Sequence, residues 1–411
     1  MIAGARGAAW APLRHRAFRT VWLTFLGVQL ANWSETVGAV DVISGQSGSA
    51  ALLALVQTAS TLPAVVLALP AGAVADLVDR RLLLAGLVSA MAASMALLAV
   101  LVAAGSAPPA VVLLLTLAMG AAIAAAVPSF AALIPDLVPS ADLASAVTLN
   151  GISINLARAV GPAVAGLALA LLSATALFAA LAAALGAMAL LVLAAPREAG
   201  APASRGERLG PAMWAGVRFA RSSRELQAVL ARGFAFVVPA SALWAVLPAI
   251  AVHQLDLDAA AFGGILAALG IGAVLGAQLL PWLRARLGLD VLVACGTAYG
   301  AVNLVLLGSL HDTVAAVASL VVAGAAWIAV LSSLNTAAQL AAPARVRGRA
   351  LSINQLVFAA GMAGGSALWG LLADVAGLQE ALLAAAGVLV ASLLASRRWP
   401  LGRDGGRGTA P

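Results

Sequence analysis

Long apolar runs separated by short polar gaps make up most of this chain. Residues 82–104 and 233–252, for example, contain no charged side chain. A helix needs roughly 20 residues to cross a hydrocarbon core about 30 Å thick, so each run is long enough to span a membrane. The runs show no strict alternation of apolar and polar residues, which favours transmembrane helices over a β-barrel.

The pattern predicts an all-α integral membrane protein with twelve transmembrane helices. The longest polar segment divides the chain into an N-terminal six-helix bundle (1–195), a cytoplasmic linker (196–228) and a C-terminal six-helix bundle with a short cytoplasmic tail (229–411). The spans are expected near residues 18–40, 50–74, 82–104, 109–129, 146–172, 174–195, 229–252, 261–281, 289–310, 314–338, 350–373 and 379–396.

Composition and charge agree with a membrane protein. The 411 residues are 63% hydrophobic and 9% charged, with a mean hydropathy of +1.05, which leaves too little polar surface for a soluble domain. All 23 basic residues are arginines, and apart from Arg158 they fall in the tails and in alternate gaps or beside them. This asymmetry places those gaps and both termini in the cytoplasm. The net charge of +7 then indicates contact with an anionic inner leaflet and no nucleic-acid partner.

The residue types exclude several classes of function. Without lysine the chain can form neither a Walker A loop nor a Schiff base. His15, His253 and His311 are too far apart in sequence to suggest a metal site. No convergent catalytic set and no filter-like segment is visible, so we expect no enzyme, no channel and no cofactor. The single cysteine, Cys295, is expected to be a buried structural thiol.

An internal repeat at an offset of 204 residues relates the two halves. Two six-helix halves related by duplication are typical of a secondary transporter, which binds its substrate between the halves near the membrane midplane. The matching pairs are Gly72 and Gly276, Arg80 and Arg284, Pro139 and Pro343, Asn150 and Asn354, Gly161 and Gly365, and Gly166 and Gly370.

The loop after the second span carries a candidate gating motif. A glycine at position 72 permits close helix approach, and an acid beside two arginines at a helix end can pair with cations and with a helix N-terminus. Such a cluster would hold the cytoplasmic face closed in one state; a plain cation-flanked loop is the alternative. The residues are Gly72, Asp76, Asp79, Arg80 and Arg81, with a partial second copy at Gly276 and Arg284, where Leu280 replaces the acid.

This loop resembles the signature of the major facilitator superfamily, G-x-x-x-D-[RK]-x-G-[RK]-[RK], with Leu77 in place of a cation and Asp79 in place of a glycine. Segments 132–166 and 345–374 resemble its transmembrane secretion effector group, which includes enterobactin-exporter-like proteins. The resemblance implies the major facilitator fold and a monomer in a bacterial inner membrane. It also implies export of a small amphipathic compound, drug-like or siderophore-like, by proton antiport through alternating access. A proton-coupled importer or facilitator of a small metabolite is the alternative.

The fifth span carries Gly161, Pro162 and Gly166, which resemble part of the antiporter motif of drug exporters. Proline and glycine inside a span permit a kink or close packing, and a merely packed helix is the alternative. Only residues 159–196 separate Arg158 from the next charge, fewer than the roughly 40 that two spans and a turn need. Arg158 is therefore expected within the membrane, for gating or attraction of an anionic substrate, unless it snorkels to the inner interface.

Glu35 is the candidate for proton coupling. It lies before Asp41, which marks the outer end of the first span. A partly buried carboxylate can exchange protons near neutral pH, whereas an interfacial charge in contact with water is the alternative. Gln29 and Asn32 lie at helical spacing on the same span and are candidates for the substrate cavity. The resemblance implies that spans one, four, seven and ten line that cavity.

Two tryptophans complete the cavity candidates. Trp244 lies in the seventh span and Trp327 in the tenth, and Asn335 follows on a similar face of the tenth. Aromatic walls with few polar groups suit amphipathic ligands, although packing or interfacial anchoring is the alternative. The expected partners are thus a small-molecule substrate, protons and the lipid bilayer.

Overall fold

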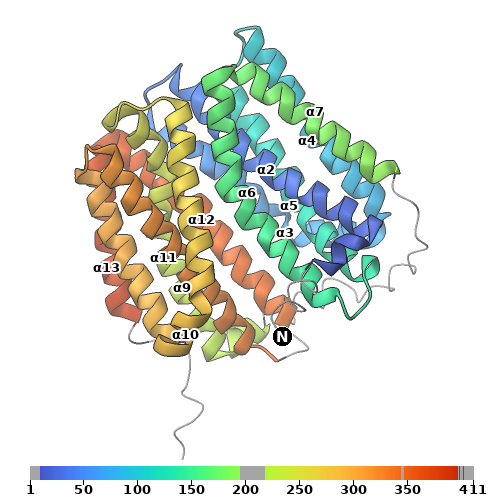
Figure 1. Ribbon diagram of the computed structural model, residues 1–411. Coiled ribbons are helices and arrows are strands. Elements are labelled where there is room, and N and C mark those ends of the chain that lie inside the picture. Colours follow the sequence, from blue (N-terminus) through green and yellow to red (C-terminus); the bar gives the residue numbers. More distant parts are fainter. Residues whose placement is uncertain (1–9, 195–217, 344–346, 397, 399–400, 402–411) are drawn as a thin grey trace, which may run out of the picture. The chain divides into compact units, whose positions relative to one another are not determined.

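The computed structural model describes residues 10–194, 218–343, 347–396, 398 and 401, without the side chains of 68–77, 132, 144, 259–260 and 347–349. Over these residues the chain is helical and contains no strand (Figure 1). The elements are η1 (Ala11–Arg14), α2 (Arg16–Ser44), α3 (Ala50–Leu77), α4 (Arg80–Ala103), α5 (Pro109–Leu137), α6 (Leu143–Leu171), α7 (Ala174–Ala194), α9 (Arg224–Ala249), η2 (Ile250–Gln254), α10 (Ala259–Ser309), α11 (Thr313–Leu340), α12 (Arg347–Ala376) and α13 (Leu378–Ser396).

Every predicted span lies on one of these helices, which confirms the all-α membrane fold. Among the described residues, 10 helices are long and apolar enough to cross a membrane. One of them, α10, holds two predicted spans and bends at Gly288, whose φ of 75° is the left-handed conformation that glycine adopts without strain. The first predicted span lies on α2, which is not among the ten; its polar residues include Gln29, Asn32 and Glu35.

Several helix boundaries follow from local sequence. Asp79 caps α4 by accepting from the backbone N–H groups of Arg81 and Leu82, and Asp312 caps α11 by accepting from Ala315 at 2.7 Å. Such caps satisfy N–H groups that have no partner inside the helix. Near the end of α9, Pro248 is followed by the π-helical turn η2, since a proline disturbs the regular hydrogen-bond ladder.

The helices form two compact units. Unit 1 comprises residues 1–48, 59–206 and 256–270, and unit 2 comprises residues 49–58, 207–255 and 271–411. In unit 1, α2 packs on α5, α6 and α7, and α4 packs on α5 and α7. In unit 2, α9 packs on α11, α12 and α13. The predicted bundles 1–195 and 229–411 stay a prediction, and most of the predicted linker lies outside the described residues.

In each unit, the helix that holds the first span of a half packs against the helix that holds the fifth span. The contact lies at Gly161 in unit 1 and at the matching Gly365 in unit 2. A Cβ atom on Gly161 of α6 would lie 2.7 Å from the Trp33 Cβ of α2. A Cβ atom on Gly365 of α12 would lie 2.6 Å from the Val238 carbonyl oxygen of α9. Close approach of this kind is the usual role of small residues in membrane helices.

The second glycine pair of the repeat, Gly166 and Gly370, also lies at equivalent helix contacts. In unit 1, a Cβ atom on Gly263 of α10 would lie 2.9 Å from the Cα of Gly166 in α6. In unit 2, a Cβ atom on Gly370 of α12 would lie 3.3 Å from the Cα of Ala51 in α3. The repeat of 204 residues found in the sequence therefore recurs as a repeat of helix contacts.

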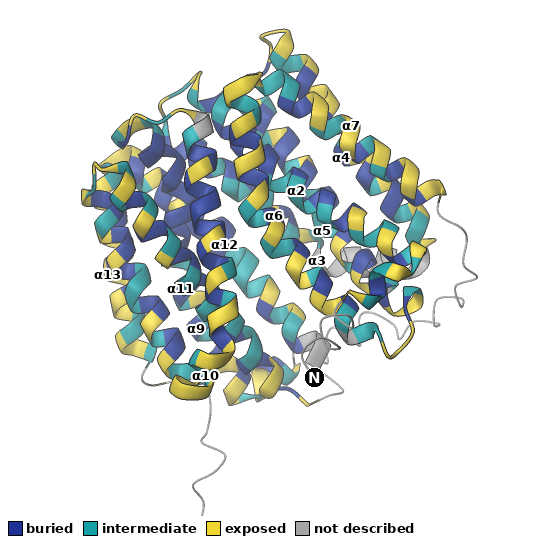
Figure 2. Cartoon of the chain, in the orientation of Figure 1, coloured by how far each residue is buried: buried dark blue, intermediate teal, exposed yellow. Residues whose placement is uncertain are grey.

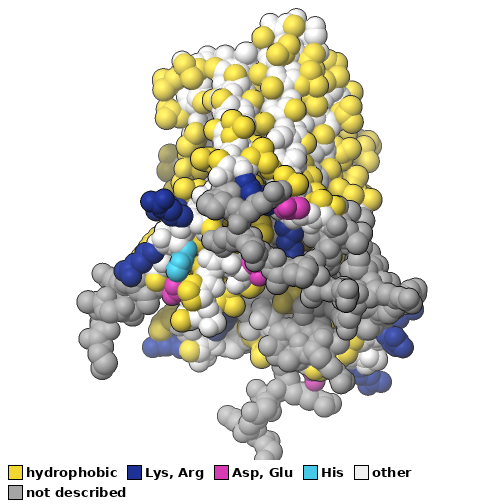
Figure 3. Space-filling view, turned by 90° about the vertical axis from the view of Figure 1, so that its right-hand side faces the viewer, with side chains coloured by type: hydrophobic (Ala, Val, Ile, Leu, Met, Phe, Trp, Pro, Cys, Tyr) yellow, Lys and Arg dark blue, Asp and Glu magenta, His cyan; other side chains and the backbone are white. Residues whose placement is uncertain are grey.

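The accessible surface of the helices is largely apolar. Exposed residues run along α7, α10 and α13 (Figure 2), and they include large hydrophobic side chains such as Leu190 and Val302. Figure 3 shows one face on which hydrophobic and uncharged side chains fill the upper part, while arginine, acidic and histidine side chains gather below. Such a surface suits contact with lipid. The expectation of a buried Cys295 was wrong: the thiol is exposed on the second half of α10, where helix packing leaves it uncovered.

We expect the substitution Gly263→Ala to lower the free energy of unfolding by about 1–3 kcal/mol, because the added Cβ meets the backbone of Pro162 and Gly166 and forces α10 away from α6. Thermal unfolding of the purified protein in detergent measures the effect. The matched control is Gly264→Ala, whose Cβ would meet nothing within 4 Å. Equal unfolding temperatures for the two variants would contradict the role of this contact.

Candidate functional site

Glu35 lies in the interior of unit 1, between α2 and α5. Its side chain is fully buried, with 0% exposure. The Thr116 hydroxyl of α5 donates to Oε1 at 2.5 Å, and Oε2 has no hydrogen-bond partner among the described residues. An ionised carboxylate is costly to bury without a cation, so this environment suits a group that carries a proton. The burial is more complete than the sequence predicted.

The sequence reasoning missed Thr116. It is the single polar side chain between Pro109 and Val127 in the fourth predicted span. The signal that could have identified Thr116 is a single hydroxyl in an otherwise apolar span. That span is the fourth of the N-terminal half.

A second acid lies at the outer end of α2. Asp41 follows the predicted span 18–40, and burial raises the pKa of its carboxyl above the ordinary value. The nearby carboxylate of Asp258, which precedes α10, raises it further. Asp41 is therefore the natural comparison for Glu35 in any test of proton coupling.

A different face of α2 carries the substrate candidates. Gln29, Asn32 and Trp33 follow helical spacing and are each half-buried. The guanidinium of Arg158 on α6 lies over the Trp33 ring, 5.4 Å from its centroid. Glu35 comes two residues after Trp33 and contacts α5 instead, so Glu35 and Arg158 do not form an ion pair.

The antiporter-like residues hold α6 close to two neighbours. Ser34 of α2 donates to the Gly161 carbonyl at 2.9 Å. Pro162 has no N–H, so the Arg158 carbonyl, four residues earlier, loses its usual helical donor. That carbonyl faces Gly270 of α10, where a Cβ atom would lie 2.8 Å from it. Gly161 and Gly166 thus lie at close helix contacts, and the antiporter-like role of Gly161, Pro162 and Gly166 stays a prediction.

The described residues of the loop motif join the ends of three helices of unit 1. Asp79 caps α4, Arg80 Nη1 lies 3.5 Å from Asp136 Oδ2 on α5, and Arg81 Nε donates to the Val192 carbonyl on α7 at 2.7 Å. Gly72 and Asp76 lie in the part of α3 whose side chains are outside the described set. The gating role of the motif stays a prediction.

The second copy of the motif keeps an equivalent contact. Gly276 packs on Ala325 of α11, where its Cβ would lie 2.6 Å from the Ala325 Cα. Arg284 Nη2 donates to Ser332 Oγ of α11 at 2.7 Å. The helices α5 and α11 each hold the fourth span of a half, so Arg80 and Arg284 both reach the fourth helix of their own half.

The tryptophans predicted from the sequence lie together in unit 2. The ring centroids of Trp244 and Trp327 are 5.5 Å apart, and Phe236 and Phe358, which the sequence reasoning missed, extend the cluster. Both tryptophans are nearly fully buried, at 6% and 5% exposure. In this conformation they pack against protein, and their place in a substrate cavity stays a prediction.

The same unit holds Asn335, which accepts a hydrogen bond from Asn354 at 2.9 Å. Asn335 lies on α11 and Asn354 on α12. The amide pair therefore joins the tenth and eleventh predicted spans.

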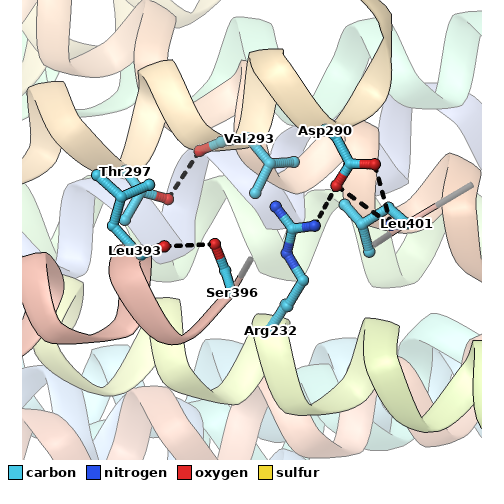
Figure 4. Close-up of polar contacts among 7 residues, drawn as sticks. All are labelled: Arg232, Asp290, Val293, Thr297, Leu393, Ser396 and Leu401. Atoms are coloured by element: carbon cyan, nitrogen blue, oxygen red, sulfur yellow. Dashed lines mark hydrogen bonds and ion pairs between the residues drawn. The ribbon is translucent and has the colours of Figure 1, made fainter. Parts of the chain in front are cut away.

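Another buried cation escaped the sequence reasoning. The Arg232 side chain on α9 is 4% exposed and forms an ion pair with Asp290 of α10 (Figure 4). Both carboxylate oxygens of Asp290 also accept from the Leu401 N–H at 3.1 Å. The spacing along the chain gives no signal for this pair, because the two residues lie 58 positions apart.

No group of three or more histidine, cysteine, aspartate and glutamate residues that could hold a metal ion occurs among the described side chains. The polar residues instead lie singly or in pairs along membrane helices. Such an arrangement can bind and release protons and solutes without covalent chemistry.

Comparison with solved structures shows which known proteins share this fold. A nucleoside transporter, NupG, matches with a TM-score of 0.72 at 15% identity over 93% of this chain and 98% of its own. A bacterial homologue of the human lysosomal transporter Spinster matches with a TM-score of 0.74 at 16% identity over 94% and 98%. A POT family transporter matches with a TM-score of 0.72 at 12% identity over 92% and 95%. The fold of this chain is therefore the one that these solved structures share.

The sequence itself narrows this class to one family. The profile of the transmembrane secretion effector family matches residues 7–405. The chain therefore belongs to that family of the major facilitator superfamily, as the resemblance in the loop and in segments 132–166 and 345–374 predicted. The protein is a multi-pass membrane transporter. No relative was found among curated proteins.

We expect Asp290→Asn to destabilise the protein by about 1–3 kcal/mol, because Arg232 would keep its charge inside unit 2 without its carboxylate. Breaking a fully buried pair costs about 3–5 kcal/mol, and the 44% exposure of Asp290 reduces that effect. Urea or thermal unfolding in detergent gives the difference.

Asp312→Asn is the control for Asp290→Asn, since an exposed asparagine still caps α11. The double variant Arg232→Met with Asp290→Asn should recover most of the loss. A single Asp290→Asn variant as stable as the Asp312→Asn control would show that the ion pair contributes nothing.

Proposed function

We propose that the protein exports a small amphipathic compound, drug-like or siderophore-like, in exchange for protons across a bacterial inner membrane. Both termini lie in the cytoplasm in this proposal, and the protein works as a monomer. The observation that carries proton coupling is the environment of Glu35, a buried carboxyl group with one oxygen bonded to Thr116 and the other unpartnered among the described residues.

A proton carrier must hold its proton within the membrane and release it to the other side. The Thr116 hydroxyl donates to Oε1, which leaves Oε2 as the oxygen that can take the proton. No arginine or histidine forms an ion pair with Glu35 among the described residues, so a proton is the cation that neutralises it. Glu35 would take up a proton from the outside and release it to the cytoplasm. This proton movement would return the transporter to the state that binds the next solute molecule.

Other predicted residues supply the conformational change. Asp79, Arg80 and Arg81, with Gly72 and Asp76, stabilise the cytoplasmic ends of the helices in one state. Gly161, Pro162 and Gly166 let α6 move against its neighbours while staying in close contact. Gln29, Asn32, Trp244, Trp327 and Asn335 are the proposed contacts of the substrate.

Export rather than import is supported by membership of a family described as secretion effectors. The nucleoside and POT family transporters share the fold at 16% identity or less, so their substrates support no assignment for this chain. The alternative is a proton-coupled importer or facilitator of a small metabolite. Vesicle orientation separates the two, because an exporter loads inside-out vesicles.

Inside-out vesicles with an imposed proton gradient, acid inside, test the proposal with a panel of dyes and iron chelates. We expect gradient-driven uptake that an uncoupler abolishes. Glu35→Gln should reduce this uptake to the level of empty vesicles, because glutamine cannot carry the proton. Glu225→Gln removes an exposed carboxylate and should leave uptake unchanged.

Asp41→Asn is the comparison that shows whether Glu35 or Asp41 carries the proton. Loss of uptake in Asp41→Asn but not in Glu35→Gln would transfer the role to Asp41. Uptake that survives collapse of the gradient in the unsubstituted protein would refute proton coupling altogether.

A further inference from the structure

Arg158 points away from the lipid-facing side of α6. Successive residues of an α-helix are about 100° apart, so Leu156, Val160 and Leu167 lie opposite Arg158. These three side chains are exposed, at 41%, 38% and 60%. They form the apolar stripe that suits lipid. An arginine on the opposite side does not reach the membrane interface along the lipid surface, which removes the main structural explanation for a charge at this depth.

The guanidinium of Arg158 has only one contact partner among the described residues. It lies over the Trp33 ring, 5.4 Å from the centroid. Its Nε is buried and has no hydrogen-bond partner there. The two terminal nitrogens also make no hydrogen bond or ion pair with described residues. A planar donor group is therefore held from one side by an aromatic ring and presented with its donors available.

Polar side chains lie on the same two helices as Trp33 and Arg158. Gln29 and Asn32 share the half-buried face of α2 with Trp33, and neither side-chain amide is hydrogen-bonded to a described residue. Asn155 lies three residues before Arg158 on α6, and its amide nitrogen donates to the Gly151 carbonyl at 3.0 Å, which leaves its side-chain oxygen available. All these residues belong to unit 1.

We propose that Arg158 and Trp33 bind the anionic end of the transported solute, so the substrate is an amphipathic organic anion such as an aromatic carboxylate or sulfonate. A cation in a low-dielectric site that lacks a protein carboxylate attracts an anion strongly, and a guanidinium matches the two oxygens of such a group. The Trp33 ring contacts the adjoining apolar part, and the amides of Gln29 and Asn32 bind polar substituents. The inference rests on the proposed transport function and names its substrate class.

The site also separates the substrate from the proton. Trp33 and Glu35 leave α2 on different sides, toward α6 and α5 respectively. The solute therefore does not displace the proton by direct contact with Glu35. Coupling between them passes through the position of α2.

Three naphthalene probes of matched size test the substrate class: naphthalene-2-sulfonate, neutral 2-naphthamide and the cationic 2-naphthyl-trimethylammonium. Equilibrium binding is measured with the full-length protein purified in detergent, without a proton gradient. We expect the sulfonate to bind at least about tenfold more tightly than the other two probes. A tenfold difference in affinity corresponds to about 1.4 kcal/mol, which one charge-assisted hydrogen bond can supply.

Variants then assign the preference to Arg158. Arg158→Gln should weaken sulfonate binding at least about tenfold and leave naphthamide binding unchanged, and retained naphthamide binding shows that the variant is folded. Arg158→Lys keeps the charge but not the planar fork, so it should recover part of the sulfonate affinity. Arg221→Gln, which removes an exposed arginine, should bind all three probes like the unsubstituted protein.

The proposal is overturned if the unsubstituted protein binds none of the probes, binds naphthamide as tightly as the sulfonate, or keeps its sulfonate preference in Arg158→Gln. Because no gradient is present, a failure here leaves proton-driven transport standing. Conversely, transport that proves independent of protons leaves the anion preference of this site intact.

Discussion

The close packing of α2 against α6 at Gly161 determines where the polar groups of unit 1 lie. A side chain at Gly161 would collide with Trp33, and the Ser34 hydroxyl bonds to the Gly161 carbonyl across the same contact. With α2 held in this orientation, Trp33 meets Arg158 while Glu35 meets Thr116. Three consecutive residues thus make three different contacts, and the helix that carries them cannot rotate without breaking all of them.

The same kind of contact recurs in the second half of the chain with different chemistry. Gly365 brings α12 onto α9, and Trp369 of α12 donates to the Val238 carbonyl of α9 at 2.7 Å. Unit 2 carries other buried groups, among them the Trp244–Trp327 cluster and the Asn335–Asn354 pair. The glycine contacts therefore repeat between the halves, whereas the buried polar and aromatic residues differ.

Features that depend on local sequence could be predicted well. The length of the apolar runs predicted the helices, and the glycine pairs of the repeat lie at equivalent helix contacts. Both follow from spacing along the chain. Contacts between distant residues could not be predicted in this way. The pairing of Glu35 with Thr116 and of Arg232 with Asp290 depends on how helices rotate against one another, and no periodicity within one helix encodes that rotation.

Exposure was predicted least well. Cys295 was expected inside the protein and lies on its surface, because in an apolar span the lipid-facing and protein-facing residues have the same composition. Trp244 and Trp327 lie together, and Trp327 also packs against Phe236 of α9 and Phe358 of α12, which the sequence did not indicate.

The central claim is that solute and protons move in opposite directions through one protein. Proteoliposomes loaded with a pH-sensitive dye test it most directly when a solute gradient is imposed without a pH gradient. The account predicts that solute flow drives protons the opposite way, so that solute leaving the vesicles acidifies the lumen, and that Glu35→Gln abolishes this pH change. Solute movement with a constant lumenal pH would contradict it.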